Sequence, residues 1–215
     1  MVNKAAIGGK AEGLVRLQEL RLPVPPFVAV PAGEEVDEAA VAALGEPLAV
    51  RSSAVGEDAA DKSAAGQYET VLGVTLETLA DAVAHVRSST VRARAYGATG
   101  DVAVVVQRQV PPTRAGVAFS RDPVSGADAI VIECALGSGE IVVGGEVTPD
   151  RYVVAGDRVE ARATGSVRTL RDDEAREVAE LVRRAEAGFG RAVDVEFCFE
   201  GRELWLVQCR PITTV

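Results

Sequence analysis

The sequence contains few aromatic residues, little lysine and one histidine. Phe, Trp and Tyr make up 4% of the 215 residues, and the lysines are Lys4, Lys10 and Lys62. The histidine, His85, lies inside a helical pattern, where we expect a packing or surface role and not that of a phosphate carrier. A chemical role for lysine therefore has few candidates.

Clustered positive charge is also missing. The formal net charge is -9 and no run of Lys and Arg occurs, which argues against a nucleic-acid partner. The first residues show no signal-peptide pattern, and no later segment is long and apolar enough to cross a membrane. We therefore expect a cytoplasmic protein with no membrane partner.

Cysteine is scarce and is not arranged for metal binding. Cys134, Cys198 and Cys209 are far apart, show no CxxC spacing and lie in strand-like runs. These positions suit reduced thiols used as small core residues, so neither a zinc site nor a redox site is expected.

Helical and strand-like patterns follow one another along the chain. Apolar residues at helical spacing occur over residues 7–20, 34–44, 75–97 and 172–188. Strand-like runs occupy residues 27–30, 47–53, 68–74, 102–110, 116–120, 129–135, 152–154 and 158–162. The length allows one large domain or two small lobes, and the alternation predicts an α+β fold.

The last part of the chain, residues 193–212, predicts a β-hairpin. Apolar and polar residues alternate on both sides of a turn that we place at residues 200–202. With this three-residue loop, Asp194 lies opposite Gln208 and Glu196 lies opposite Leu206. One face of the hairpin then carries four polar side chains, those of Asp194, Glu196, Gln208 and Arg210.

These four side chains favour a site for a metal and a phosphate. Two neighbouring carboxylates are difficult to keep ionised without a cation, and Arg210 with a divalent metal would supply the positive charge. The alternative is an ordinary amphipathic hairpin at the edge of a sheet, with these residues in solvent.

The first helical pattern begins with Gly8, Gly9 and Lys10. Free backbone N–H groups at a helix N-terminus attract anions, and Lys10 could reach the same anion, so this is a candidate phosphate site. The segment lacks the GxxxxGK pattern of a Walker A loop. Alternatively, Lys10 is a surface lysine at the start of a helix.

The strand over residues 47–53 carries Arg51 near its end, and a loop of small residues follows over 54–67. The loop is longer than most connections, so we expect either a cover over a ligand or a solvated connector. Ser63 and Gly66 are the positions where its backbone could approach a phosphate closely.

Four segments together resemble one family. They are GGKAEGLVRLQELRLPVPPFVAV; VRSSAVGEDAADKSAAGQYETVLGV; GVAFSRDPVSG with IECALGSGEIVVGGEVTPDRYVV; and VDVEFCFEGRELWLVQCRPITT. In this order they are similar to the nucleotide-binding domain of phosphoenolpyruvate synthases and pyruvate phosphate dikinases, which rifampin phosphotransferases share. The resemblance spans residues 7 to 214.

The resemblance implies an ATP-grasp fold, in which two α+β lobes with mixed or antiparallel sheets and flanking helices close over ATP and Mg²⁺. The lobes would comprise residues 1–100 and 101–215. The implied activity is that of an ATP-dependent phosphotransferase.

The resemblance also implies roles for individual residues. Phosphate contacts would come from Lys10, Arg51 and Arg210, and the loop with Ser63 and Gly66 would cover the transferring group. Backbone groups between Gln107 and Val110 would contact adenine. Magnesium would be held or oriented by Glu196 and Gln208, with Asp194 nearby.

The sequence departs from the family in two ways. Residues 31–49 replace a much longer segment, so the first lobe is shortened. The family also continues into a swivelling domain with a phosphorylated histidine and usually a pyruvate-binding barrel, and neither occurs here. We therefore expect the phosphoryl acceptor, a histidine or another group, on a separate partner protein. The alternatives are direct phosphorylation or activation of a small molecule and a non-catalytic nucleotide-binding module.

Overall fold

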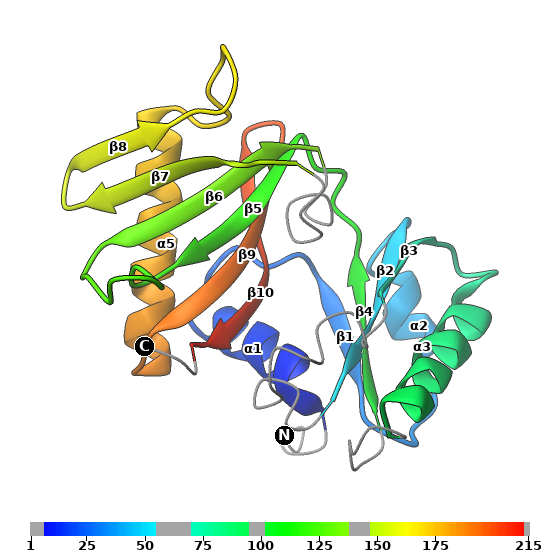
Figure 1. The fold of residues 1–215 in the computed structure, drawn as a ribbon. Helices are drawn as coiled ribbons and strands as arrows, with labels where there is room; N and C mark the ends of the chain where they lie inside the picture. Colours follow the sequence, from blue (N-terminus) through cyan, green and yellow to red (C-terminus); the bar gives the residue numbers. More distant parts are fainter. Residues whose placement is uncertain (1–6, 55–69, 95–101, 138–146, 213–215) are drawn as a thin grey trace. The chain divides into compact units, whose positions relative to one another are not determined.

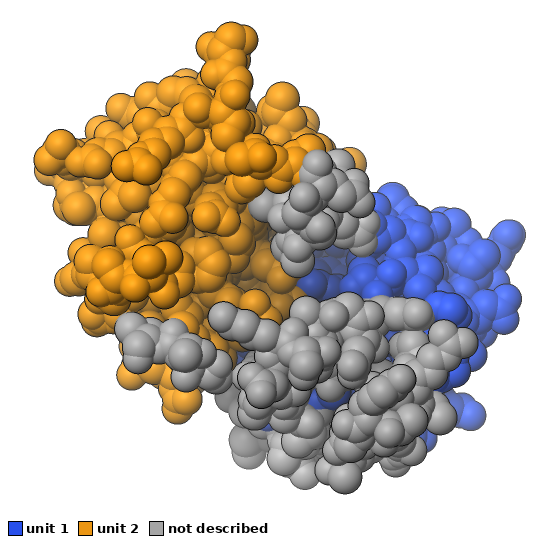
Figure 2. Space-filling model, in the orientation of Figure 1, with its two compact units in different colours: residues 1–13, 25–109 blue, residues 14–24, 110–215 orange. Residues whose placement is uncertain are grey.

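The computed structural model describes residues 7–54, 70–94, 102–137 and 147–212. The chain forms two compact units, residues 1–13 with 25–109 (unit 1) and residues 14–24 with 110–215 (unit 2) (Figure 2). Each unit contains one antiparallel sheet (Figure 1). Ser63 and Gly66, predicted to cover the phosphates, lie outside the described residues.

Unit 1 is built on a four-stranded sheet. Its order is β1 (Phe27–Val30), β4 (Ala103–Arg108), β2 (Leu48–Ser53) and β3 (Thr70–Val74). Helices α2 (Glu38–Ala42) and α3 (Leu79–Arg94) belong to the same unit.

The two faces of the unit 1 sheet differ. Alternate residues such as Val50 and Val104 are fully buried and pack in one cluster with Val83 and Val86 of α3. The other face therefore receives the intervening residues, among them Arg51 of β2.

Unit 2 is built on a six-stranded sheet with the order β10-β9-β5-β6-β7-β8 (Figure 1). The strands are β5 (Arg114–Phe119), β6 (Ile130–Leu136), β7 (Asp150–Ala155), β8 (Arg158–Arg162), β9 (Val193–Glu200) and β10 (Glu203–Pro211). Strands β9 and β10 form the predicted hairpin at one edge of the sheet.

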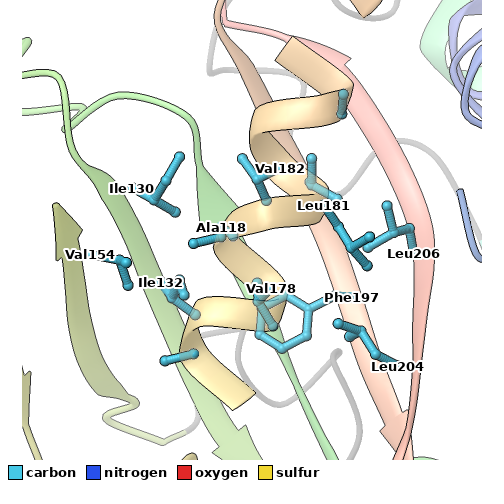
Figure 3. Close-up of a cluster of buried hydrophobic side chains, with 14 of the residues drawn as sticks. Ala118, Ile130, Ile132, Val154, Val178, Leu181, Val182, Phe197, Leu204 and Leu206 are labelled. Carbon is cyan, nitrogen blue, oxygen red and sulfur yellow. The ribbon is translucent and has the colours of Figure 1, made fainter. Parts of the chain in front are cut away.

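Helix α5 (Asp172–Phe189) packs on one face of this sheet (Figure 3). Its apolar residues recur every three or four positions, so they form one stripe that is buried against the strands. The helix ends at Gly190, whose φ of 69° is the left-handed conformation that glycine adopts most easily. The buried residues of this stripe include Ala175, Val178, Leu181, Val182 and Ala185.

Helix α1 (Gly8–Glu19) contributes residues to both units, since the division falls after Gly13. In unit 2, Leu17 joins the core with α5, and Leu20 packs against it. Gly188 of α5 allows this close contact, because a Cβ there would lie 2.3 Å from Cδ1 of Leu20 and the leucine side chain would have to move.

The α+β fold class predicted from the sequence is confirmed, and the predicted helices and strands are present with boundaries shifted by a few residues. All the described strand pairs are antiparallel. The predicted lobe boundary after residue 100 falls in residues 95–101, outside the described part. No helix within the described ranges is long and apolar enough to span a membrane.

Candidate functional site

The face of the unit 2 sheet turned away from α5, here called the polar face, carries the candidate site. Register pairing places Glu196 of β9 between Gln208 of β10 and Val117 of β5. The same row continues through Glu133 of β6 to Arg151 of β7. Directly opposite residues on neighbouring strands point to one face, so these side chains line one surface.

The predicted register of the hairpin is wrong. The turn contains two residues, Gly201 and Arg202, and the register shifts between Leu206 and Gln208. Gln208 therefore lies opposite Glu196, and Arg210 opposite Asp194. A β-bulge at Val207 shifts the register of β10 by one residue, so that the residues after it pair differently with β9. The four polar residues still share one face, as predicted, but with different partners.

Arg210 and Asp194 form an ion pair across β9 and β10. The Nε atom of Arg210 lies 2.9 Å and 2.8 Å from the two carboxylate oxygens. The Asp194 side chain is 10% exposed, whereas that of Arg210 is 50% exposed. A buried carboxylate holding a half-exposed guanidinium fixes the direction of the arginine.

Glu196 and Gln208 are the two residues predicted to hold magnesium. They are directly opposite each other; Gln208 is buried and Glu196 is half-buried. Among the described residues, no group of three or more His, Cys, Asp and Glu could hold a metal. One carboxylate and one amide still fit Mg²⁺, which prefers oxygen ligands and usually takes the remainder from water and nucleotide phosphates.

An apolar patch adjoins Glu196 on the polar face. Cys198, two residues further along β9, lies opposite Trp205 and packs with Val110 and Ala115. The bulged residue Val207 packs against the same cluster. From the sequence, Cys198 was expected only as a small core residue. It lies two residues from Glu196 and therefore on the same side of the strand, and this position could have indicated the patch.

In unit 1, the sheet face opposite α3 carries two of the other predicted residues. Arg51 of β2 is half-buried, and Gln107 of β4 is buried opposite Ala49. The Nε2 atom of Gln107 donates a hydrogen bond to the carbonyl of Pro25 at 3.3 Å. Ser53, further along β2 on the Arg51 side, contacts the start of α1 and so brings Lys10 to the same end of this sheet.

The expectation of free backbone N–H groups at the start of α1 is wrong at two positions. The N–H of Gly9 donates to the carbonyl of Ala54 at 3.2 Å. The N–H of Ala11 donates to Oγ of Ser53 at 3.0 Å. Gly8 is needed for this contact, because a Cβ there would lie 2.2 Å from the Ser53 carbonyl oxygen. The start of α1 is thus bound to the end of β2, and a phosphate contact by the Lys10 side chain remains a prediction.

Two backbone N–H groups of the segment predicted to contact adenine form hydrogen bonds within the protein. The N–H of Arg108 donates to the carbonyl of Pro26, and that of Gln109 donates to Pro47, each at 2.9 Å. Val110 is buried in the patch with Cys198. Contact of this segment with a nucleotide remains a prediction.

Asp150 fixes the chain beside β7, a role that sequence analysis did not predict. Its carboxylate accepts hydrogen bonds from the backbone N–H groups of Thr164 at 2.6 Å and Thr169 at 2.8 Å. Burial acts to raise the pKa of Asp150, but these hydrogen bonds outweigh it, and the pKa is lowered. Asp150, the last residue of the TPD sequence at 148–150, therefore holds the backbone at Thr164 and Thr169 in place.

All three cysteines are buried and none forms a disulfide. Burial raises the pKa of Cys134 to about 12, so its thiol stays protonated at neutral pH. This agrees with the predicted role of cysteine as a small core residue.

Comparison with known structures supports the fold. The ATP complex of D-alanine–D-alanine ligase from Bacillus anthracis superposes with a TM-score of 0.56 and 10% identity, covering 95% of this chain and 53% of the ligase. The similarity shows the ATP-grasp fold that the sequence resemblance predicted.

Curated relatives lie in the predicted family. A probable phosphoenolpyruvate synthase of Archaeoglobus fulgidus is 36% identical over 78% of this chain and 27% of its own length. A rifampicin phosphotransferase of a Streptomyces species is 34% identical over 87% of this chain and 26% of its own length. The chain thus spans about a quarter of these relatives.

The family described as pyruvate phosphate dikinase, AMP/ATP-binding domain, matches residues 31–166 and 157–215. The matched ranges include every strand of the two sheets except β1, and they include the hairpin with Glu196, Gln208 and Arg210. The chain belongs to this family of AMP/ATP-binding domains.

Proposed function

We propose that the chain binds Mg-ATP and transfers a phosphoryl group to an acceptor outside these 215 residues. The observation that carries the proposal is the pairing of Glu196 with Gln208 beside the Asp194–Arg210 ion pair on the polar face. A metal-binding pair and an oriented guanidinium are what a phosphate chain requires, because phosphoryl transfer depends on positioning and on neutralising charge.

In this proposal Glu196 and Gln208 hold Mg²⁺, which when bound supplies positive charge to the phosphate oxygens. Arg210 binds a phosphate, and Asp194 orients Arg210 and is not itself a metal ligand. The ion pair supports this assignment, since both Asp194 oxygens already accept from Arg210.

The remaining contacts with the nucleotide are proposed for the other residues that the family resemblance indicates. Lys10 and Arg51 contact phosphates, and the segment from Gln107 to Val110 contacts the base. The apolar patch around Cys198 and Trp205 supports a base-binding role, because flat aromatic rings pack well on such surfaces. Ser63 and Gly66 are proposed to cover the transferring group.

The acceptor is proposed to be a histidine of a separate swivelling domain or partner protein. A second candidate, a small molecule, is favoured by the similarity to a rifampicin phosphotransferase, whose name gives a small-molecule substrate. Transfer of label from β- and γ-labelled ATP to purified histidine domains, or to small molecules without any added protein, separates the two acceptors.

The substitution Glu196→Gln tests the metal role. We expect label transfer or ATP turnover to fall about 100-fold or more, because a charged metal ligand is lost. Calorimetric titration with ATP, at several Mg²⁺ concentrations, should show weaker Mg²⁺ dependence while the nucleotide still binds.

Glu203→Gln is the matched control, because it removes the same charge from an exposed position on β10. This variant should behave as the unmodified protein. Unchanged turnover and Mg²⁺ dependence in Glu196→Gln would contradict the proposed site.

A further inference from the structure

A second charged region of the polar face lies on β7 and β8. Arg151 and Arg162 are directly opposite each other in the antiparallel pair, so both side chains leave the same face. They line a pocket of about 330 Å³ together with Asp122, Ser125, Val153 and Glu160. The pocket lies entirely within unit 2.

The two acidic residues of this pocket already have partners. Oδ1 of Asp122 accepts hydrogen bonds from the backbone N–H groups of Val124 at 2.9 Å and Ser125 at 3.3 Å. Its other oxygen, Oδ2, makes a 3.4 Å contact with Arg151. Glu160 pairs with Arg158 at 2.8 Å.

One guanidinium group of the pocket is available to a ligand. The lining contains two arginines, Arg151 and Arg162, and two carboxylates, Asp122 and Glu160. Arg151 contacts Asp122 and lies directly opposite Glu133 of β6. Arg162 forms no hydrogen bond or ion pair with any other residue that the structure describes. Like charges directly opposite each other in a sheet are destabilising, so the pair favours an added negative charge.

We propose that Arg151 and Arg162 form a binding site for a small oxyanion, a phosphate or carboxylate group. Two guanidinium groups on one side of a pocket suit this ligand, because each presents a planar set of N–H donors that matches two oxygens. Ser125 adds a hydroxyl to the lining.

This site is separate from the proposed magnesium site. Strands β5 and β6 lie between β9 and β7, so Arg151 is three strand spacings, about 14 Å, from Glu196. The inference does not depend on phosphotransferase activity and can be tested without turnover.

The test is an NMR titration that follows the arginine Nε–H signals during addition of inorganic phosphate and, separately, acetate, with chloride keeping the ionic strength constant. A non-hydrolysable ATP analogue with Mg²⁺ is present in one series, so that phosphate cannot occupy the nucleotide site. We expect saturable shifts of the Arg151 and Arg162 signals with at least one anion in both series.

Arg162→Gln should weaken this binding about tenfold or more, because charge-assisted hydrogen bonds are lost. The fold should survive, since the substitution removes repulsion from an exposed position. Arg202→Gln, at the exposed β9–β10 turn, removes the same charge as a control and should leave the affinity unchanged. Non-saturating shifts, or equal losses in Arg162→Gln and Arg202→Gln, would overturn the proposal.

Discussion

The two faces of the unit 2 sheet are made by the same strands, yet they serve different purposes. Phe197 is 1% exposed and packs in the core with α5, whereas its neighbour Glu196 faces away from that core. Successive side chains of a strand point to opposite faces. Phe197 therefore lies in the core, and the adjacent Glu196 lies on the face that carries the candidate site. Substitutions on the two faces should therefore change different measured quantities.

The largest effect is expected at Phe197. Phe197→Ala removes a fully buried ring, and the free energy of unfolding should fall by about 3–5 kcal/mol. Urea denaturation measures this change, with Glu196→Gln as the comparison from the polar face. Glu196→Gln should change the unfolding free energy by less than about 1 kcal/mol. Equal losses in the two variants would show that the faces are not separated as described.

The next effect concerns Asp150, a polar residue among the buried residues of the sheet. Asp150→Asn weakens its hydrogen bonds with Thr164 and Thr169 and should cost about 1–3 kcal/mol. The pKa of Asp150 is lowered in the folded chain, so its contribution is present above the unfolded pKa of about 4 and is lost as the pH falls further.

The pH dependence provides the check. Unfolding free energies measured from pH 7 to pH 2.5 should converge for the unmodified protein and Asp150→Asn as the pH falls. Asp157→Asn, in the exposed turn between β7 and β8, is the control and should follow the unmodified protein at every pH. A constant difference between Asp150→Asn and the unmodified protein would exclude ionised Asp150 as the cause.

The smallest effect is expected at Asp194. Asp194→Asn should leave the unfolding free energy nearly unchanged, because its partner Arg210 is half exposed and such ion pairs are weak. The Kd for ATP should rise about tenfold, since Arg210 loses its orientation. The Mg²⁺ concentration needed for half-maximal activity should stay the same. A marked increase in that concentration would identify Asp194 as a metal ligand instead.

The sequence predicted the faces of the hairpin better than its register. Alternation of apolar and polar residues is local, so Asp194, Glu196, Gln208 and Arg210 were placed correctly on one face. The partners were wrong because turn length and the bulge at Val207 depend on how β10 fits both β9 and the core. Neither is determined by the pattern within one strand.

Contacts between segments that are distant in the sequence could not be predicted either. The start of α1 was expected to present its N–H groups to an anion, but Ala54 accepts that of Gly9 and Ser53 accepts that of Ala11. Ser53 follows Ala11 by 42 residues, and helix propensity gives no information about such a partner. The loop with Ser63 and Gly66 lies outside the described residues, so its role remains a prediction.

The bulge at Val207 has a consequence for how the chain tolerates changes in length. The register of β10 against β9 shifts at Val207, because Leu206 and Gln208 lie opposite the consecutive residues Phe197 and Glu196. A chain shortened by this one residue could keep the pairs Leu206–Phe197 and Gln208–Glu196, and would lose the local twist and the packing of Val207 on the apolar patch. Removing any residue between Glu203 and Leu206 would instead force the strand out of step with its neighbour. Val207 is thus the point in the last strand where natural length variation is most easily accommodated.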